Sequence, residues 1–109
     1  MSRTAAWIAL AVAGLVDVAW AISMKKAQGY ANLGWSLVSL ALLAAFVFLL
    51  GRALQVLPLG PAYAVWTGIG AVGTVLAGVV LFGEALNPVR LAGIALVLAG
   101  IVVLKLDAG

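Results

Sequence analysis

The stretch TAAWIALAVAGLVDVAWAIS, residues 4–23, contains a single charged side chain in 20 residues. A helix needs about 20 predominantly apolar residues to cross a bilayer, so this stretch predicts a membrane-spanning helix. Three further apolar runs follow, at about residues 33–51, 59–82 and 89–104. Only short connections separate the four runs. The sequence therefore predicts an all-α membrane protein, with one four-helix transmembrane domain over residues 1–109.

The composition excludes whole classes of protein. The chain of 109 residues is 67% hydrophobic and 8% charged, whereas soluble domains average about 45–50% apolar and about 25% charged residues. The chain has no Cys and no His. Disulfides, thiol nucleophiles, histidine-based catalysis and nearly all zinc, haem and iron–sulfur sites are therefore excluded. We expect neither a metal nor a cofactor.

The basic residues are scattered between the apolar runs, which fits lipid headgroups and not a nucleic acid. Short connections make consecutive helices antiparallel neighbours. The six Lys and Arg side chains then divide three against three between the membrane faces: Arg3, Arg52 and Lys105 on one, Lys25, Lys26 and Arg90 on the other. Because a Lys/Arg asymmetry orients membrane proteins, its absence predicts insertion in both orientations and pairing with an inverted copy. One fixed topology set by the N-terminus is the alternative.

Asp17 is the ionisable residue deep inside a span. Intramembrane acids are costly and by default mark ion or proton pathways. Gly14, Asp17 and Trp20 are three residues apart and share a helix face, on which the small glycine would let another helix approach closely. The alternative is a carboxylate that pairs with a buried hydroxyl and only holds helices together.

A single buried acid favours transport over catalysis. Hydrolysis usually needs a second titrating group or a metal, so we do not expect an enzyme. Reversible proton binding needs only one acid: the protonated carboxyl is neutral, and the ionised carboxylate attracts a cation. Proton and cation then compete for one site, which is the minimal chemistry of an antiporter.

Aromatic residues could wall a cavity around this acid. Trp20, Tyr63 and Trp66 have rings that attract cations, and the Tyr63 hydroxyl could orient the carboxylate. Tyr63 and Trp66 are three residues apart and share a face of their helix. Trp7 and Trp35, close to the ends of spans, are instead typical of an interfacial belt.

Glycines predict flexible or closely packed positions. Gly68 and Gly70 form a candidate hinge in the third run, for which close helix packing is the competing explanation. Gly93 and Gly100, seven residues apart on one face of the fourth run, suit a close helix–helix contact, and we expect them in a dimer interface. Glu84, in the turn before that run, is expected to be solvated.

The segments GLVDVAWA, residues 14–21, and PLGPAYAVWTGIG, residues 58–70, carry a family resemblance. With them, essentially the full chain resembles the small multidrug resistance family of four-helix exporters. Trp20, three residues after the acid and followed by Ala21, is similar to the guanidinium-exporter branch.

The resemblance implies an antiparallel, dual-topology homodimer in a bacterial-type inner membrane that exchanges guanidinium for protons. Asp17 of both subunits would form the shared site. There a carboxylate can accept two hydrogen bonds from the planar guanidinium ion. Trp20 would limit the cavity to small planar cations. Tyr63 would hydrogen-bond the acid and couple the subunits, and Trp66 would line the cavity.

Two departures from the family pattern leave alternatives open. The family acid is ordinarily Glu, so Asp17 is one methylene shorter. Phe46 stands where the guanidinium branch has a hydroxyl on its second helix, on which Ser36 and Ser39 are the remaining hydroxyls. The chain could therefore export larger lipophilic or quaternary ammonium cations, or be a non-transporting subunit of a heteromeric pair.

Overall fold

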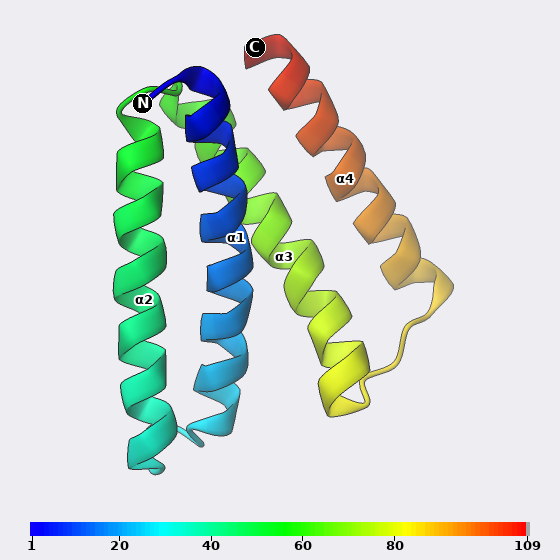
Figure 1. Cartoon of the computed structure of the whole chain (residues 1–109). Coiled ribbons are helices and arrows are strands. Elements are labelled where there is room, and N and C mark those ends of the chain that lie inside the picture. Colours follow the sequence, from blue (N-terminus) through cyan, green and yellow to red (C-terminus); the bar gives the residue numbers. More distant parts are fainter. Residues whose placement is uncertain (109) are drawn as a thin grey trace.

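In the computed structural model, which describes residues 1–108, the chain folds into the helices that the apolar runs predict (Figure 1). Within these residues there are four: α1 (Arg3–Lys26), α2 (Leu33–Leu54), α3 (Leu59–Phe82) and α4 (Pro88–Ala108). Each is long and apolar enough to cross a membrane. The expectation of an all-α protein with four candidate spans is confirmed.

Three helices are longer than their apolar runs. α3 has the bounds of its run, but α1 continues through Lys26, α2 through Leu54 and α4 through Ala108. The last turns of these helices contain Lys or Arg, and a positive charge is favourable there because a helix C-terminus is partially negative. The apolar run marks the hydrocarbon-facing length, and the helix extends beyond it into the polar interface.

Polar side chains begin three of the helices. The side-chain oxygens of Ser2, Asn32 and Asn87 each accept a hydrogen bond from the backbone N–H three residues further on, at 3.1, 3.2 and 2.9 Å. Such caps satisfy one of the free N–H groups of a first helical turn. These caps therefore help to fix the residues at which the three helices begin.

Both termini lie at one end of the array, and the α1–α2 and α3–α4 connections lie at the other (Figure 1). α1 packs on α2 and α3, and α4 packs on α3. Near the termini α4 also reaches α1, where the Arg3 guanidinium donates to the Ala108 carbonyl and the Lys105 ammonium lies 5.4 Å from the Trp7 ring centre. The two groups of basic residues lie at opposite ends of the array, as the charge pattern predicts.

The buried core is small and lies toward the end that carries the termini. Its apolar members come from the first three helices and the turn after α2: Ala6, Leu10, Ala53, Leu57, Ala62 and Val65. No described residue of α4 is buried. Large apolar side chains remain uncovered, among them Val80 at 79% and Val89 at 81% exposure. An apolar surface of this extent is suited to lipid or to another protein chain.

Candidate functional site

Asp17 lies where α1 crosses the backbone of α3. A Cβ atom added at Gly70 would lie 2.5 Å from Oδ2 of Asp17, a distance that only a shift of the carboxylate could relieve. The carboxylate therefore rests directly on the α3 backbone, at a position that only glycine leaves free. This contact defines the candidate site.

Two further glycines fix the register of α1 on α3. A Cβ added at Gly14 would lie 2.6 Å from Cγ2 of Ile69, and one added at Gly73 would lie 2.5 Å from Cγ2 of Val18. α1 and α3 run in the same direction (Figure 1), so these contacts flank Asp17 on both sides. α3 packs against α1 at Gly14, and this contact positions Asp17, which lies about one turn further along α1.

Four aromatic rings join the helices in a continuous run. The ring centres of Trp20 and Phe46 are 5.4 Å apart, those of Phe46 and Trp66 5.7 Å, and those of Trp66 and Tyr63 5.3 Å. These separations are typical of packed aromatic pairs. Phe46 is 5% exposed and takes the centre of the run. Phe46 thus joins Trp20 of α1 to Trp66 of α3, a role that its place in the sequence did not indicate.

Polar atoms beside this apolar run are left without partners. Within residues 1–108, Trp20 Nε1, Trp66 Nε1 and Ser39 Oγ are buried and make no hydrogen bond. Ser36, by contrast, donates to the Asn32 carbonyl at 2.7 Å. A buried N–H or hydroxyl without a partner is costly. The indole N–H groups of Trp20 and Trp66 are therefore available to an acceptor or to water that enters the site.

Hydroxyl groups do not hold Asp17 within the single chain. The hydrogen bonds of residues 1–108 include none from a hydroxyl to its carboxylate. The alternative in which Asp17 only pairs with a buried hydroxyl therefore finds no support in the described residues.

Tyr63 lies away from the acid in the single chain. It precedes Gly70 by seven residues, about 10 Å along a helix, and 51% of its surface is exposed. Among the described residues its ring packs on Trp66 and its carbonyl accepts from Thr67 at 2.8 Å. A hydrogen bond from Tyr63 to an acid stays a prediction that needs a second subunit.

The candidate hinge is part of a continuous helix. α3 runs through Gly68 and Gly70 without a break. A Cβ added at Gly68 would lie 2.9 Å from Cδ1 of Ile101 in α4, and one added at Gly70 would lie against Asp17. Close packing accounts for both glycines, and hinge bending stays a prediction.

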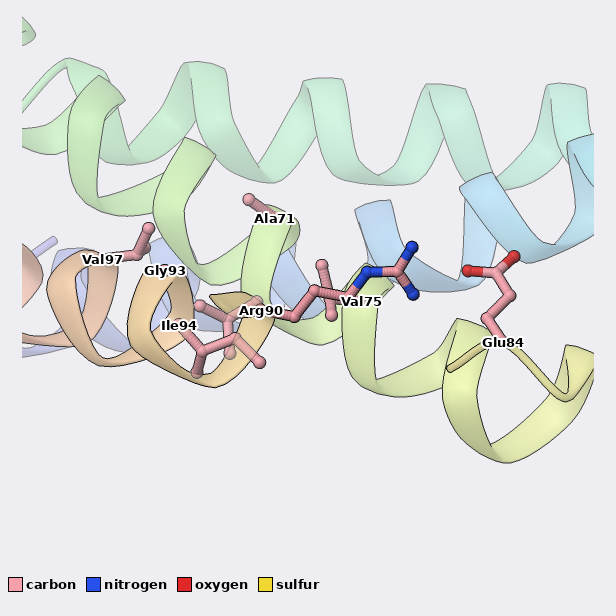
Figure 2. A pocket seen from close by; sticks show the side chains of 8 residues that line it. Ala71, Val75, Glu84, Arg90, Gly93, Ile94 and Val97 are labelled. Carbon is pink, nitrogen blue, oxygen red and sulfur yellow. The ribbon is translucent and has the colours of Figure 1, made fainter. Parts of the chain in front are cut away.

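The surface of α4 is open at the two glycines expected in a dimer interface. No atom lies within 4 Å of a Cβ built at Gly93 or Gly100. Gly93 also lines a groove of about 450 Å³ between α3 and α4, with apolar walls and with Glu84 and Arg90 at one end (Figure 2). The dimer contact stays a prediction, and this face has room for it.

Glu84 makes contacts that the sequence did not indicate. Gly83 ends α3 with a left-handed φ of 65°, and the Glu84 N–H donates to the Gly78 carbonyl at 3.1 Å. The chain thus turns back, and Oε2 of Glu84 lies 3.2 Å from Nζ of Lys25 in α1. Glu84 is exposed, as expected, and it also pairs with Lys25. Gly83, a typical helix-ending residue, and Lys25 on the same membrane face were the available signals.

Known proteins resemble the chain over most of its length. The family described as Small Multidrug Resistance protein matches residues 5–97. A protein of Yersinia pseudotuberculosis named guanidinium exporter is 52% identical over 101 residues, which are 93% of this chain and 97% of that protein. Guanidinium exporters of Escherichia coli strain K12 and Citrobacter freundii are 48% and 46% identical, each over 93% of this chain and 96% of their own length.

Proposed function

The chain belongs to the small multidrug resistance family, and from this premise we propose that it is a proton-coupled exporter of guanidinium-like cations. It is an integral membrane protein, and a bacterial inner membrane is its setting. The relatives quoted above are named as exporters. The proposed working unit is an antiparallel, dual-topology homodimer.

The observation that carries the proposal is the position of Asp17. It is an acid deep inside a span, pressed against Gly70 of α3. When ionised, a carboxylate binds a guanidinium ion through two parallel charge-assisted hydrogen bonds. When protonated, it is neutral and attracts no cation. Because one group cannot hold both, uptake of a proton releases the cation, and the two are exchanged.

The aromatic run supports a planar cation as the substrate. The rings of Trp20 and Trp66, bridged by Phe46, offer faces that attract positive charge. Guanidinium is planar and weakly hydrated, and it stacks on aromatic faces more readily than an ammonium ion does. Trp20 and Trp66 are proposed to line the cavity, with Gly14 positioning the helix that carries the acid.

Three features support the paired, inverted assembly. The basic residues divide evenly between the two ends of the chain. α4 leaves Gly93 and Gly100 uncovered, and Tyr63 is half-exposed. In the proposed dimer Gly93 and Gly100 pack against the second subunit, and the Tyr63 hydroxyl hydrogen-bonds an acid across the contact. Gly68 and Gly70 then let α3 bend as access alternates between the membrane faces.

Exchange in proteoliposomes tests this function. Purified protein is reconstituted with a pH-sensitive dye inside, and an inward guanidinium gradient is imposed. The interior should become more alkaline as protons leave against the entering cation, and it should become more acidic when the gradient is reversed. Guanidinium entry without proton movement would contradict coupling. Absence of cation binding, together with co-purification of a second four-span chain, would select the non-transporting subunit.

Phe46 favours larger lipophilic cations as a second candidate substrate class. Its ring is buried between two tryptophans, where the resemblance led us to expect a hydroxyl. If this run of rings lines the substrate path, as proposed, its apolar surface gives a lipophilic cation more contact than it gives guanidinium. Competition by tetraphenylphosphonium, without competition by guanidinium, would select this class.

Replacing Phe46 by Ser should shift preference toward guanidinium. Loss of the ring removes about 1 kcal/mol of aromatic contact from a lipophilic cation, so tetraphenylphosphonium affinity should fall by roughly fivefold relative to guanidinium affinity. Phe46→Leu, which keeps most of the apolar volume, is the matched control. Equal losses for both cations in F46S would refute a selective role for the ring.

A further inference from the structure

The α1–α3 contact is closed at one membrane face by an ion pair. Nζ of Lys25 lies 3.2 Å from Oε2 of Glu84 and 4.8 Å from the ring centre of Phe82 at the end of α3. Glu84 is folded back over Gly78 by the left-handed turn at Gly83. The last turns of α1 and α3 are thus fastened together two turns beyond Asp17.

A cleft lies between this ion pair and the acid. It has a volume of about 80 Å³, and its lining includes Ala21, Thr74 and Gly78 together with Lys25 and Glu84. Ala21 follows Asp17 by four residues, and Thr74 follows Gly70 by four. In an α-helix this spacing is about one turn. The cleft therefore begins one turn beyond the Asp17–Gly70 contact and ends at the ion pair.

The cleft is large enough for water, and its mostly apolar lining includes three polar residues, Thr74, Lys25 and Glu84. A bound water needs about 10–15 Å³ of such volume and two to four polar partners, so several waters fit. The Thr74 hydroxyl, the Glu84 carboxylate and the Lys25 ammonium can serve as partners. Toward the acid, Val18 packs on Gly73 so closely that an added Cβ would lie 2.5 Å away.

Building on the proposed function, we propose that this cleft carries protons between Asp17 and the membrane face of Lys25, with Glu84 as the proton acceptor and donor at its mouth. As a cation binds, the Asp17 carboxyl loses its proton to water in the cleft. That water passes a proton to a Glu84 carboxylate oxygen, which releases it to bulk water.

The charges around Glu84 suit a residue at the mouth of such a route. Lys25 holds the carboxylate from α1. On the other side, the Arg90 guanidinium points toward Glu84 across the α3–α4 groove and donates to the Ala85 carbonyl (Figure 2). The ion pair with Lys25 keeps the carboxylate at the end of the cleft. In the proposed inverted dimer, each membrane face receives one such mouth.

Glu84→Gln tests the role of the carboxylate at nearly constant shape. In proteoliposomes, guanidinium-driven proton movement should slow roughly tenfold, less than the ~10²-fold that a directly acting proton-transfer group contributes. The guanidinium dissociation constant and its pH dependence should stay at wild-type values, because the Asp17 site is untouched. Glu84→Asp, which keeps a carboxylate at this position, should retain most of the wild-type rate. Lys26→Gln, which removes a charge at the same face but contacts Trp35, is the control and should leave the rate unchanged.

Thr74→Val gives an independent test within the cleft. It removes the hydroxyl without a large change in volume, and it should slow proton movement with unchanged guanidinium affinity. Wild-type rates in both E84Q and T74V, or an E84D rate as low as that of E84Q, would overturn the proton route. Those results would leave the proposed function intact, because that function fails only if the wild-type protein moves no protons with guanidinium.

Discussion

Asp17→Asn is expected to abolish guanidinium-driven proton movement in proteoliposomes. Asn has nearly the same shape, so the contact with Gly70 remains, but it carries no charge and binds no exchangeable proton. Loss of charge-assisted hydrogen bonds should cost about 3 kcal/mol of binding free energy, or on the order of 10²-fold in guanidinium affinity. Calorimetric binding and dye-reported proton movement measure the two effects on one preparation.

The same substitution at Asp107 is the matched control. Asp107 lies in the last turn of α4, beyond the apolar run, and Asp107→Asn should leave affinity and proton movement unchanged. Retention of the guanidinium response by D17N would refute the central role of the buried acid. Equal losses in both variants would point to the net charge of the protein instead.

Gly70→Ala is the second substitution with a large expected effect. The new methyl group would lie 2.5 Å from Oδ2 of Asp17, so the carboxylate must move. Displacing a reacting group by about 1 Å can cost up to ~10²-fold in function, and we expect guanidinium affinity to fall by at least roughly tenfold. The helix itself should not suffer, because Ala is favoured over Gly in helices by up to ~1 kcal/mol.

Gly60→Ala separates the two effects of that change. Gly60 lies in the first turn of the same helix, and no atom lies within 4 Å of its added Cβ, so this change adds a methyl group without a new contact. Gly60→Ala should keep wild-type affinity. Wild-type affinity in G70A, measured on folded protein, would show that the carboxylate does not depend on the bare backbone of α3.

The helices were predictable because lipid imposes a simple length rule. A run of about 20 apolar residues is what a bilayer core requires, and the four runs of this sequence satisfy that rule. The helix ends were less predictable. Capping by Asn32 and continuation of α1 through Lys26 depend on local hydrogen bonds and interfacial charge, which apolar length does not report.

Parts of the candidate site followed from the chain alone. Asp17 stood out because an acid inside a span is rare and costly, and spacing correctly placed Tyr63 beside Trp66. The contact of Asp17 with Gly70 did not follow. It depends on how far α1 slides along α3, which is set by packing at Gly14 and Gly73, and no local pattern encodes that register.

The remaining contacts join residues far apart in sequence. Phe46 meets Trp20 and Trp66 only once α2 has packed, and Lys25 and Glu84 are 59 positions apart. Charge counting placed the lysine and the α3–α4 turn on the same membrane face. It could not place their side chains against each other, because that geometry arises from the left-handed turn at Gly83.

A pH titration of guanidinium binding to the purified protein tests the central claim, competition between proton and cation for Asp17, most directly. Affinity should rise with pH and then level off, with a slope of up to about tenfold per pH unit for each proton displaced. Asp17→Asn should bind weakly and without pH dependence. A wild-type dissociation constant that is the same at every pH, or a pH dependence that persists in D17N, would contradict the account.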